Sequence, residues 1–195
     1  MLVRATLAVA FLLMAVSARA QTAKTKALID LLHRETKEDT VRARRLVRVA
    51  SAFFYDRSDT AQVLLREAQA LSRKIGDARG LARALNYLSV FTEDFDTLYL
   101  FMSEAIPAAK AAGDLEQLAY SYATLSFGYM RSNEITGRET THNIPPEALS
   151  YADSAVIIAQ AIGDSAELSV ALSKKAEILN FLGRLDEAHG AVGTA

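Results

Sequence analysis

The residues that carry out chemistry in other proteins are few and far apart in this sequence. The three histidines, His33, His142 and His189, are widely separated, which favours surface positions over a shared metal site. The chain has no cysteine, which excludes disulfides, thiolate metal ligands and cysteine nucleophiles. It also has no Gly-x-Ser-x-Gly elbow, phosphate-binding loop or dinucleotide-binding fingerprint. The sequence therefore predicts a protein that is not an enzyme and that uses no metal and no other cofactor.

Two groups of charged residues allow both a functional and a structural interpretation. Glu93, Asp94 and Asp96 would suit a catalytic carboxylate pair or a calcium site. Catalysis by paired carboxylates needs two groups fixed across a cleft, so we favour a solvated turn with a helix N-cap. A basic stripe near the start of the chain could meet phosphate, but we favour a solvent-facing side of a helix. The stripe consists of Arg42, Arg44, Arg45 and Arg48.

The composition favours a helical protein of ordinary domain size. The chain has 195 residues, 51% of them hydrophobic, with only 9 glycines and 3 prolines. So few turn-forming residues are typical of helices rather than of a β-rich or loop-rich fold. The formal net charge of −1 argues against a nucleic-acid partner, which would require a clear basic excess.

The first twenty residues have the pattern of a secretory signal peptide. Arg4 precedes an uncharged, mostly apolar run from Ala5 to Val16. Small residues at Ala18 and Ala20 then match the pattern that signal peptidase requires. The apolar run is too short to cross a bilayer, which takes about 20 residues. We therefore expect cleavage between Ala20 and Gln21 and a soluble, periplasmic or extracellular chain without a membrane span.

A Gly-Asp pair that can separate two helices occurs three times in the sequence. Gly76-Asp77, Gly113-Asp114 and Gly163-Asp164 each place a glycine directly before an aspartate. Glycine adopts the left-handed conformation that ends a helix, and aspartate is a strong N-cap. Each pair therefore predicts that one helix ends and another begins at once.

Small residues recur at helical spacing between these junctions. Alanines and other compact residues lie four and then three positions apart, so that they share one face of a helix. Helices approach closely only where the facing side chains are small. This spacing predicts pairs of tightly packed helices. The sets are Ala61, Leu65 and Ala68; Leu98, Met102 and Ala105; and Ala148, Ala152 and Ala155.

These features together resemble the tetratricopeptide repeat family, whose unit is about 34 residues. The segments that carry the resemblance are 86–89, 125–129, 146–152 and 182–188, the last reading Leu-Gly-Arg-Leu-Asp-Glu-Ala. The resemblance implies an all-α fold, an α-solenoid of about four antiparallel helix pairs wound into a right-handed superhelix. The Gly-Asp junctions and the slightly long repeats are similar to the extracytoplasmic sensor regions of bacterial histidine kinases and related regulators.

On this basis the chain divides into three parts. A signal peptide (1–20) and a lead-in helix or linker (21–40) precede a repeat domain (41–195). We place the repeats at 41–77, 78–114, 115–164 and 165–195, and the last is incomplete. The third repeat contains an inserted polar loop at 132–144, and Pro146 should open the next helix.

In this family the first helix of each pair lines the concave face, which implies a set of partner-binding residues. Aromatic residues and arginine dominate binding energy at interfaces, although each phenylalanine has about even odds of belonging to the core instead. The lysine and asparagine set with which chaperone-binding members hold a peptide carboxylate is not reproduced. The candidates are Arg44, Phe54, Tyr55, Arg83, Asn86, Tyr120, Phe127, Met130, Arg131 and Phe181, with Val47, Ser51, Val90, Ser173 and Glu177 beside them.

Two functions remain open from the sequence. The first is a non-enzymatic, exported scaffold that binds a protein or a peptide in its concave groove. The alternative is the sensory ectodomain of a longer two-component or transcriptional signalling protein, truncated before its effector domain. No polar capping helix follows 165–195, which favours a fragment over a face covered by a partner.

Overall fold

The chain folds into helices. The computed structural model describes residues 37–53, 59–135 and 145–193, and before them residues 27, 29, 30, 32 and 34. Within these ranges every regular element is a helix and no strand occurs, which confirms the predicted all-α class. The elements are α2 (Thr40–Ala52), α3 (Asp59–Ile75), α4 (Ala78–Leu88), the 3-10 helix η2 (Ser89–Phe91), α5 (Phe95–Ala112), α6 (Leu115–Ile135), α7 (Pro146–Ile162), α8 (Ser165–Phe181) and α9 (Leu185–Gly193).

The repeated glycines end helices as predicted. Gly76, Gly113 and Gly163 have φ angles of +72°, +61° and +73°. A fourth glycine, Gly183, does the same between α8 and α9 with φ of +73°. A side chain with a Cβ is strained in this left-handed region, whereas glycine is not. The glycines therefore fix where α3, α5, α7 and α8 stop.

The aspartates that follow these glycines cap the next helix. Asp77 accepts a hydrogen bond from the backbone N–H of Gly80 at 3.1 Å. Asp164 accepts from the backbone N–H of Ala166 at 2.8 Å. Asp114 likewise accepts from the N–H of Gln117, at 3.2 Å. Each carboxylate satisfies a donor that has no partner inside the helix, so the next helix starts after only two intervening residues.

The Gly163→Ala variant should lower the free energy of unfolding by about 1 kcal/mol, because alanine is strained at a φ of +73°. Gly190→Ala is the matched control, since Gly190 lies within α9 and a Cβ there would meet nothing within 4 Å. That variant should be neutral or stabilise by up to about 1 kcal/mol. Urea unfolding followed by circular dichroism measures both values. Equal effects of the two substitutions would contradict the assignment of Gly163 as a helix end.

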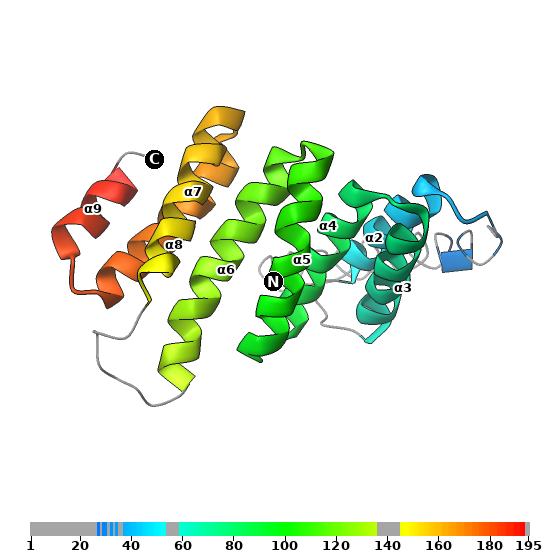
Figure 1. Cartoon of the computed structure of the whole chain (residues 1–195), viewed down its shortest axis with the longest axis horizontal. Helices are drawn as coiled ribbons and strands as arrows, with labels where there is room; N and C mark the ends of the chain where they lie inside the picture. The colour runs from blue at the N-terminus through cyan, green and yellow to red at the C-terminus, as the bar shows by residue number, and fades with distance from the viewer. Residues whose placement is uncertain are drawn as a thin grey trace, which may run out of the picture.

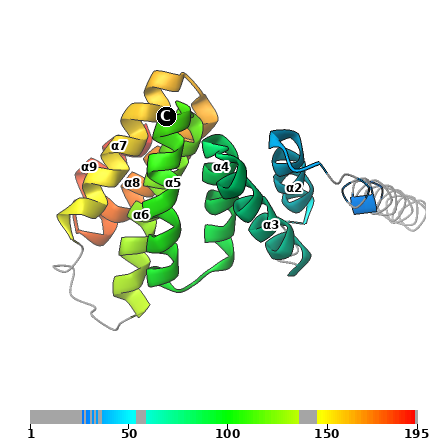
Figure 2. The ribbon, with the colours of Figure 1, turned by 45° about the vertical axis from the view of Figure 1, so that its right-hand side comes forward.

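Consecutive helices pack side by side. Each helix from α2 to α9 contacts the one that follows it in the chain. The helices form a row along the longest axis of the molecule, from α2 and α3 at one end to α9 at the other (Figure 1), and the view turned by 45° has the same ends (Figure 2). Contacts also join α2 to α4, α4 to α6 and α6 to α8. The even-numbered helices α2, α4, α6 and α8 therefore form a continuous layer.

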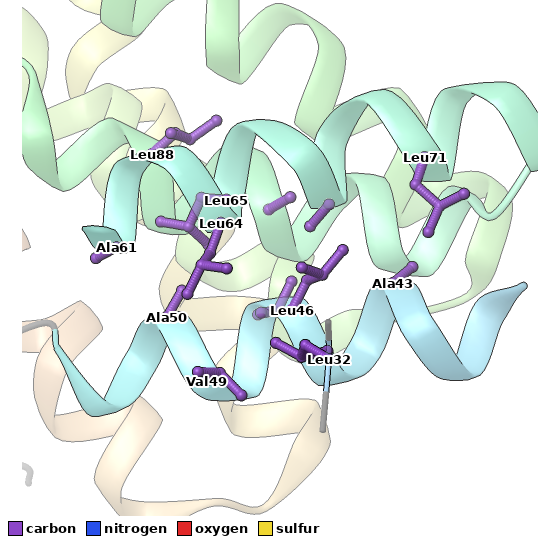
Figure 3. Packing of buried hydrophobic residues seen from close by; sticks show 13 residues of the cluster. Leu32, Ala43, Leu46, Val49, Ala50, Ala61, Leu64, Leu65, Leu71 and Leu88 are labelled. Carbon is purple, nitrogen blue, oxygen red and sulfur yellow. The ribbon is translucent and has the colours of Figure 1, made fainter. Parts of the chain in front are cut away.

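The interior is divided among several apolar clusters between neighbouring helices. In the cluster at the N-terminal end, Leu46 of α2 and Leu65 of α3 are each 1% exposed and meet Leu88 of α4, as Figure 3 shows. Leu32 joins this cluster from before α2. Burying a leucine side chain stabilises the fold by about 2 kcal/mol. Such clusters join each helix to its neighbours.

The small residues lie at the closest contacts, as their spacing predicted. The alanines of all three sets are fully buried, with exposed fractions of 0%. Ala148 and Ala152 of α7 pack with both Met130 of α6 and Ile178 of α8. The alanines of the three sets are Ala61, Ala68, Ala105, Ala148, Ala152 and Ala155.

The predicted inserted loop at 132–144 is wrong at its N-terminal end, because α6 continues to Ile135. Residues 136–144 lie outside the described residues. At the other end, α7 begins at Pro146, as predicted. The fixed φ of proline suits the first turn of a helix, and its missing N–H leaves no hydrogen bond unmade there.

Other predictions also concern parts of the chain outside the described residues. These are the signal peptide at 1–20, the cleavage between Ala20 and Gln21, most of the lead-in at 21–40, and Phe54 and Tyr55. Among the helices that are described, none is both long and apolar enough to cross a membrane.

Candidate functional site

A cleft of about 320 Å³ lies between α6, α8 and the connection from α4 to α5. Most of its exposed lining is apolar, and we call it the apolar cleft. Its polar and charged lining residues include Tyr120, Thr124, Arg131 and Lys174. The apolar side chains that line it are Val90, Phe95, Leu98, Ala123, Phe127 and Val170.

Helix α6 supplies one wall of the apolar cleft through helical spacing. Tyr120, Thr124, Phe127 and Arg131 follow one another at intervals of four, three and four residues, so they lie on one face of the helix. Tyr120 and Phe127 are half-buried and Arg131 is exposed. The wall thus changes from aromatic side chains to a cation along α6.

Gly128 allows α5 to approach α6 at the base of the cleft. A Cβ at this position would lie 2.8 Å from Cδ2 of Leu98 and 3.4 Å from the ring of Phe95. Both neighbours belong to α5 and line the same cleft. Any larger residue at position 128 would push these side chains away. The shape of the cleft therefore depends on glycine at position 128, which has no side chain.

A cation covers the aromatic ring of Phe127. The Nζ atom of Lys174, on α8, lies 3.7 Å from the centroid of this ring. The same Nζ lies 3.2 Å from a carboxylate oxygen of Glu177. Cations are attracted to the negative face of an aromatic ring. Lys174 therefore links α8 to α6 and holds a positive charge beside an apolar surface.

Tyr120, which lines the cleft, has a neutral hydroxyl. Burial raises the pKa of its phenol above the usual value, and the nearby phenol of Tyr87 raises it further. A hydrogen bond to Thr124 acts in the opposite direction, but burial dominates. The hydroxyl therefore stays protonated at neutral pH and can both donate and accept a hydrogen bond.

A second concave region of about 380 Å³ lies next to the cleft, between α2, α4 and the first turn of α6. We call it the arginine hollow, because Arg44, Arg48 and Arg83 all line it. Glu116 is the acidic residue among those that line it. Arg44 and Arg48 are exposed and one helical turn apart on α2. Neither forms an ion pair within the part of the chain that the structure describes.

Arg83 is held in place by two acidic residues at the start of α6. A guanidinium nitrogen of Arg83 lies 3.8 Å from the carboxylate of Asp114 and 3.7 Å from that of Glu116. Asp114 is 7% exposed and forms a shorter ion pair with Arg79, at 3.1 Å. Arg83 therefore lies near two carboxylates, and both of its ion-pair distances are longer than the one between Arg79 and Asp114.

Asn86, a predicted binding residue, instead forms a buried polar contact between α4 and α6. Its Nδ2 donates to the backbone oxygen of Gln117 at 3.0 Å and to the Oε1 of Gln117 at 3.1 Å. Its Oδ1 accepts from the hydroxyl of Ser121 at 2.8 Å. Asn86 is 2% exposed. Its hydrogen bonds join helices, and it is not available to a ligand.

The structure brings most of the other predicted binding residues to these two concave regions. Tyr120, Phe127 and Arg131 line the apolar cleft together with Val90. Arg44 and Arg83 line the arginine hollow together with Val47 and Ser51. The prediction is not met at Met130, which is 7% exposed and packs against Ala148 and Ile178. Phe181 is half-buried in the same cluster.

In each of the two charged clusters considered from the sequence, one residue has a structural role that the contacts define. Asp94 is the N-cap of α5, as favoured from the sequence. The Thr97 hydroxyl and the Thr97 backbone N–H donate to it at 2.6 and 2.8 Å and lower the pKa of its carboxyl. Within the basic stripe, Arg42 pairs with Glu67 at 2.6 Å. No group of metal-ligating side chains occurs among the described residues, and His189 lies exposed on α9.

The sequence analysis missed Thr124, Val170 and Lys174, which line the apolar cleft. Thr124 is found by continuing the spacing from Tyr120 along α6. For α8 we had placed Ser173 and Glu177 on the binding face, but Val170 and Lys174 line the cleft. The hydrophobic spacing of α8 does not distinguish these faces, because apolar residues occur on both.

Neither the models of known protein families nor the curated proteins include a match to this chain.

Proposed function

We propose that the chain is a tetratricopeptide-like scaffold that binds a peptide or a protein segment on the layer formed by α2, α4, α6 and α8. The observation that carries the proposal is the apolar cleft in this layer. Its volume of about 320 Å³ is within the range of about 300–1,000 Å³ of ligand sites. In this proposal the chain acts by binding and not by catalysis.

The arrangement of the helices supports a solenoid of four pairs, α2/α3, α4/α5, α6/α7 and α8/α9. Each pair packs against the next, and the first helices of successive pairs also contact one another. A solenoid stacks similar units in this way, so that each unit touches only its neighbours. In such a stack the first helices would form the concave face that the family resemblance implies.

The chemistry of the cleft supports an apolar anchor residue on the partner. Phe127, Val170 and Leu98 supply surface that loses its contact with water when an apolar side chain enters. Around them the Tyr120 hydroxyl and the Arg131 guanidinium can bond to a peptide backbone or a carboxylate. A few polar groups around an apolar centre are typical of peptide recognition. Export is part of the same proposal and is supported by the leader pattern at 1–20.

The Val170→Glu variant should abolish binding of a peptide selected by phage display on the immobilised chain. Val170 is 47% exposed at the cleft, so the glutamate adds charge without disturbing the core. An apolar anchor would then have to enter beside a carboxylate, which we expect to weaken binding at least tenfold, or by about 1.4 kcal/mol.

Val63→Glu is the matched control, because Val63 is also an exposed valine, 65% exposed, on α3 and outside the cleft. This variant should bind the selected peptide as tightly as the unaltered chain, by fluorescence anisotropy. Circular dichroism should show full helicity for both variants. A selected peptide that binds Val170→Glu and the unaltered chain equally would place the binding site elsewhere and would refute the proposal.

A further inference from the structure

We propose that the arginine hollow binds the acidic segment of a peptide whose apolar anchor occupies the apolar cleft. This inference rests on the proposed function and adds the chemistry of the partner. It goes beyond the basic stripe in the sequence, because the stripe is divided in the structure. Arg42 is engaged by Glu67, whereas Arg44 and Arg48 line a concave region that Arg83 enters from α4.

The charge of the hollow is the first argument. Three arginines and one glutamate line it, so the lining carries an excess of positive charge. Arg44 and Arg48 make no ion pair within the described ranges, and the contacts of Arg83 with acidic residues are long, at 3.7 and 3.8 Å. Guanidinium groups bind carboxylates through paired hydrogen bonds. A carboxylate in the hollow could therefore bind the guanidinium groups of Arg44 and Arg48, which have no acidic partner among the described residues.

The position of the hollow is the second argument. Tyr87 lines the hollow and Val90 lines the apolar cleft, one turn further along α4 and η2. On α6, Gln117 lines the hollow and Tyr120 lines the cleft, again three residues apart. Three residues of helix rise by only about 4.5 Å. The two sites are therefore adjacent parts of one surface, and a short extended peptide reaches both.

The acidic residues beside the hollow favour a peptide over a nucleic acid. Glu116 lines the hollow, and Asp114 lies buried behind it. A nucleic acid needs a continuous basic surface along its backbone, and these carboxylates would repel successive phosphates. A peptide needs to place only one or two carboxylates beside the exposed arginines. It also supplies apolar side chains for the neighbouring cleft, which a nucleic-acid backbone does not.

The test uses a fluorescein-labelled hexaglutamate peptide and the full chain, with fluorescence anisotropy as the measurement. We expect saturable binding at low salt that weakens as salt is added, because exposed charges are screened. Arg48→Gln should weaken binding by about fivefold, and the Arg44→Gln/Arg48→Gln double variant by about twentyfold. Both arginines are exposed, so these variants should keep full helicity by circular dichroism.

Arg66→Gln is the matched control, since Arg66 is exposed on α3 and does not line the hollow. It should bind hexaglutamate as the unaltered chain does. Equal weakening by Arg66→Gln and Arg48→Gln, or no binding of hexaglutamate at all, would overturn the inference. Tighter binding of a thymidine hexanucleotide than of hexaglutamate would also overturn it, as would displacement of hexaglutamate by inorganic phosphate at equal charge concentration.

Hexaglutamate has no apolar side chain, so its binding does not require the apolar cleft. Loss of selected-peptide binding in Val170→Glu with no hexaglutamate binding would uphold the proposed function and refute only the acidic segment. Hexaglutamate binding through Arg48, together with unchanged peptide binding in Val170→Glu, would show an acidic-peptide site in the hollow but refute the proposed binding at the apolar cleft, and with it the peptide that spans both.

Discussion

The Asn86→Asp substitution is expected to lower the free energy of unfolding by about 3 kcal/mol at neutral pH. Asn86 is 2% exposed, and its Nδ2 donates to two oxygens of Gln117. An ionised carboxylate of the same shape has no proton for these oxygens and would place a negative charge against both. Burial would add the cost of removing that charge from water.

The destabilisation caused by Asn86→Asp should diminish as the pH falls. The introduced carboxyl would have a folded-state pKa above its unfolded value of about 3.9, because its surroundings disfavour the charged form. The folded chain would then bind the proton more strongly than the unfolded chain, so the variant regains stability as pH falls through the folded pKa. Urea unfolding at a series of pH values measures the free energy of unfolding of the variant and shows whether it recovers.

Asn180→Asp is the matched control, because Asn180 is exposed on α8. Asn180→Asp should change the free energy of unfolding by no more than about 0.5 kcal/mol. This change should not decrease at acid pH as the change at Asn86 does. A small and pH-independent effect at both positions would contradict the buried hydrogen-bond network between α4 and α6.

The second large effect is expected at Ala152, where Ala152→Leu should destabilise the fold by about 1–3 kcal/mol. Ala152 is 0% exposed on α7 and packs with Met130 of α6 and Ile178 of α8. A leucine has no room at this contact of three helices, so it must displace side chains or separate the helices. Thermal and urea unfolding measure the loss.

Ala161→Leu provides the comparison on the same helix, since Ala161 is exposed. That variant should change the free energy of unfolding by no more than about 0.5 kcal/mol. An unchanged melting temperature for Ala152→Leu would mean that α7 does not approach its neighbours through its alanines, contrary to the packing described above.

The helix boundaries could be predicted because they depend on local chemistry. A glycine that must adopt a positive φ, followed by an aspartate that caps the next helix, is visible in the sequence at Gly76, Gly113 and Gly163. The end of α6 could not be predicted in this way. No Gly-Asp pair marks it, and the polar residues Ser132, Asn133 and Glu134 suit both a loop and a helical turn.

The binding surface could be predicted only in part, because it depends on how helices turn toward one another. Spacing placed Tyr120, Phe127 and Arg131 on one face of α6. It did not show that Met130, the residue before Arg131, packs against Ala148 of α7 and Ile178 of α8. Nor did the spacing show that the Asn86 side chain would form hydrogen bonds with Gln117 and Ser121. A one-residue difference in helix rotation, which sequence patterns do not resolve, separates a core position from a surface one.

The central claim is that the layer of even-numbered helices binds a peptide, and a methyl NMR titration of the full chain with a selected peptide tests it most directly. Valine methyl signals report on both sides of the molecule. Val90 and Val170 line the apolar cleft, whereas Val41 and Val63 are exposed outside it. The account predicts saturable shifts of the Val90 and Val170 signals with the other two unchanged. Shifts at Val63 and Val41, with Val90 and Val170 unmoved, would contradict it.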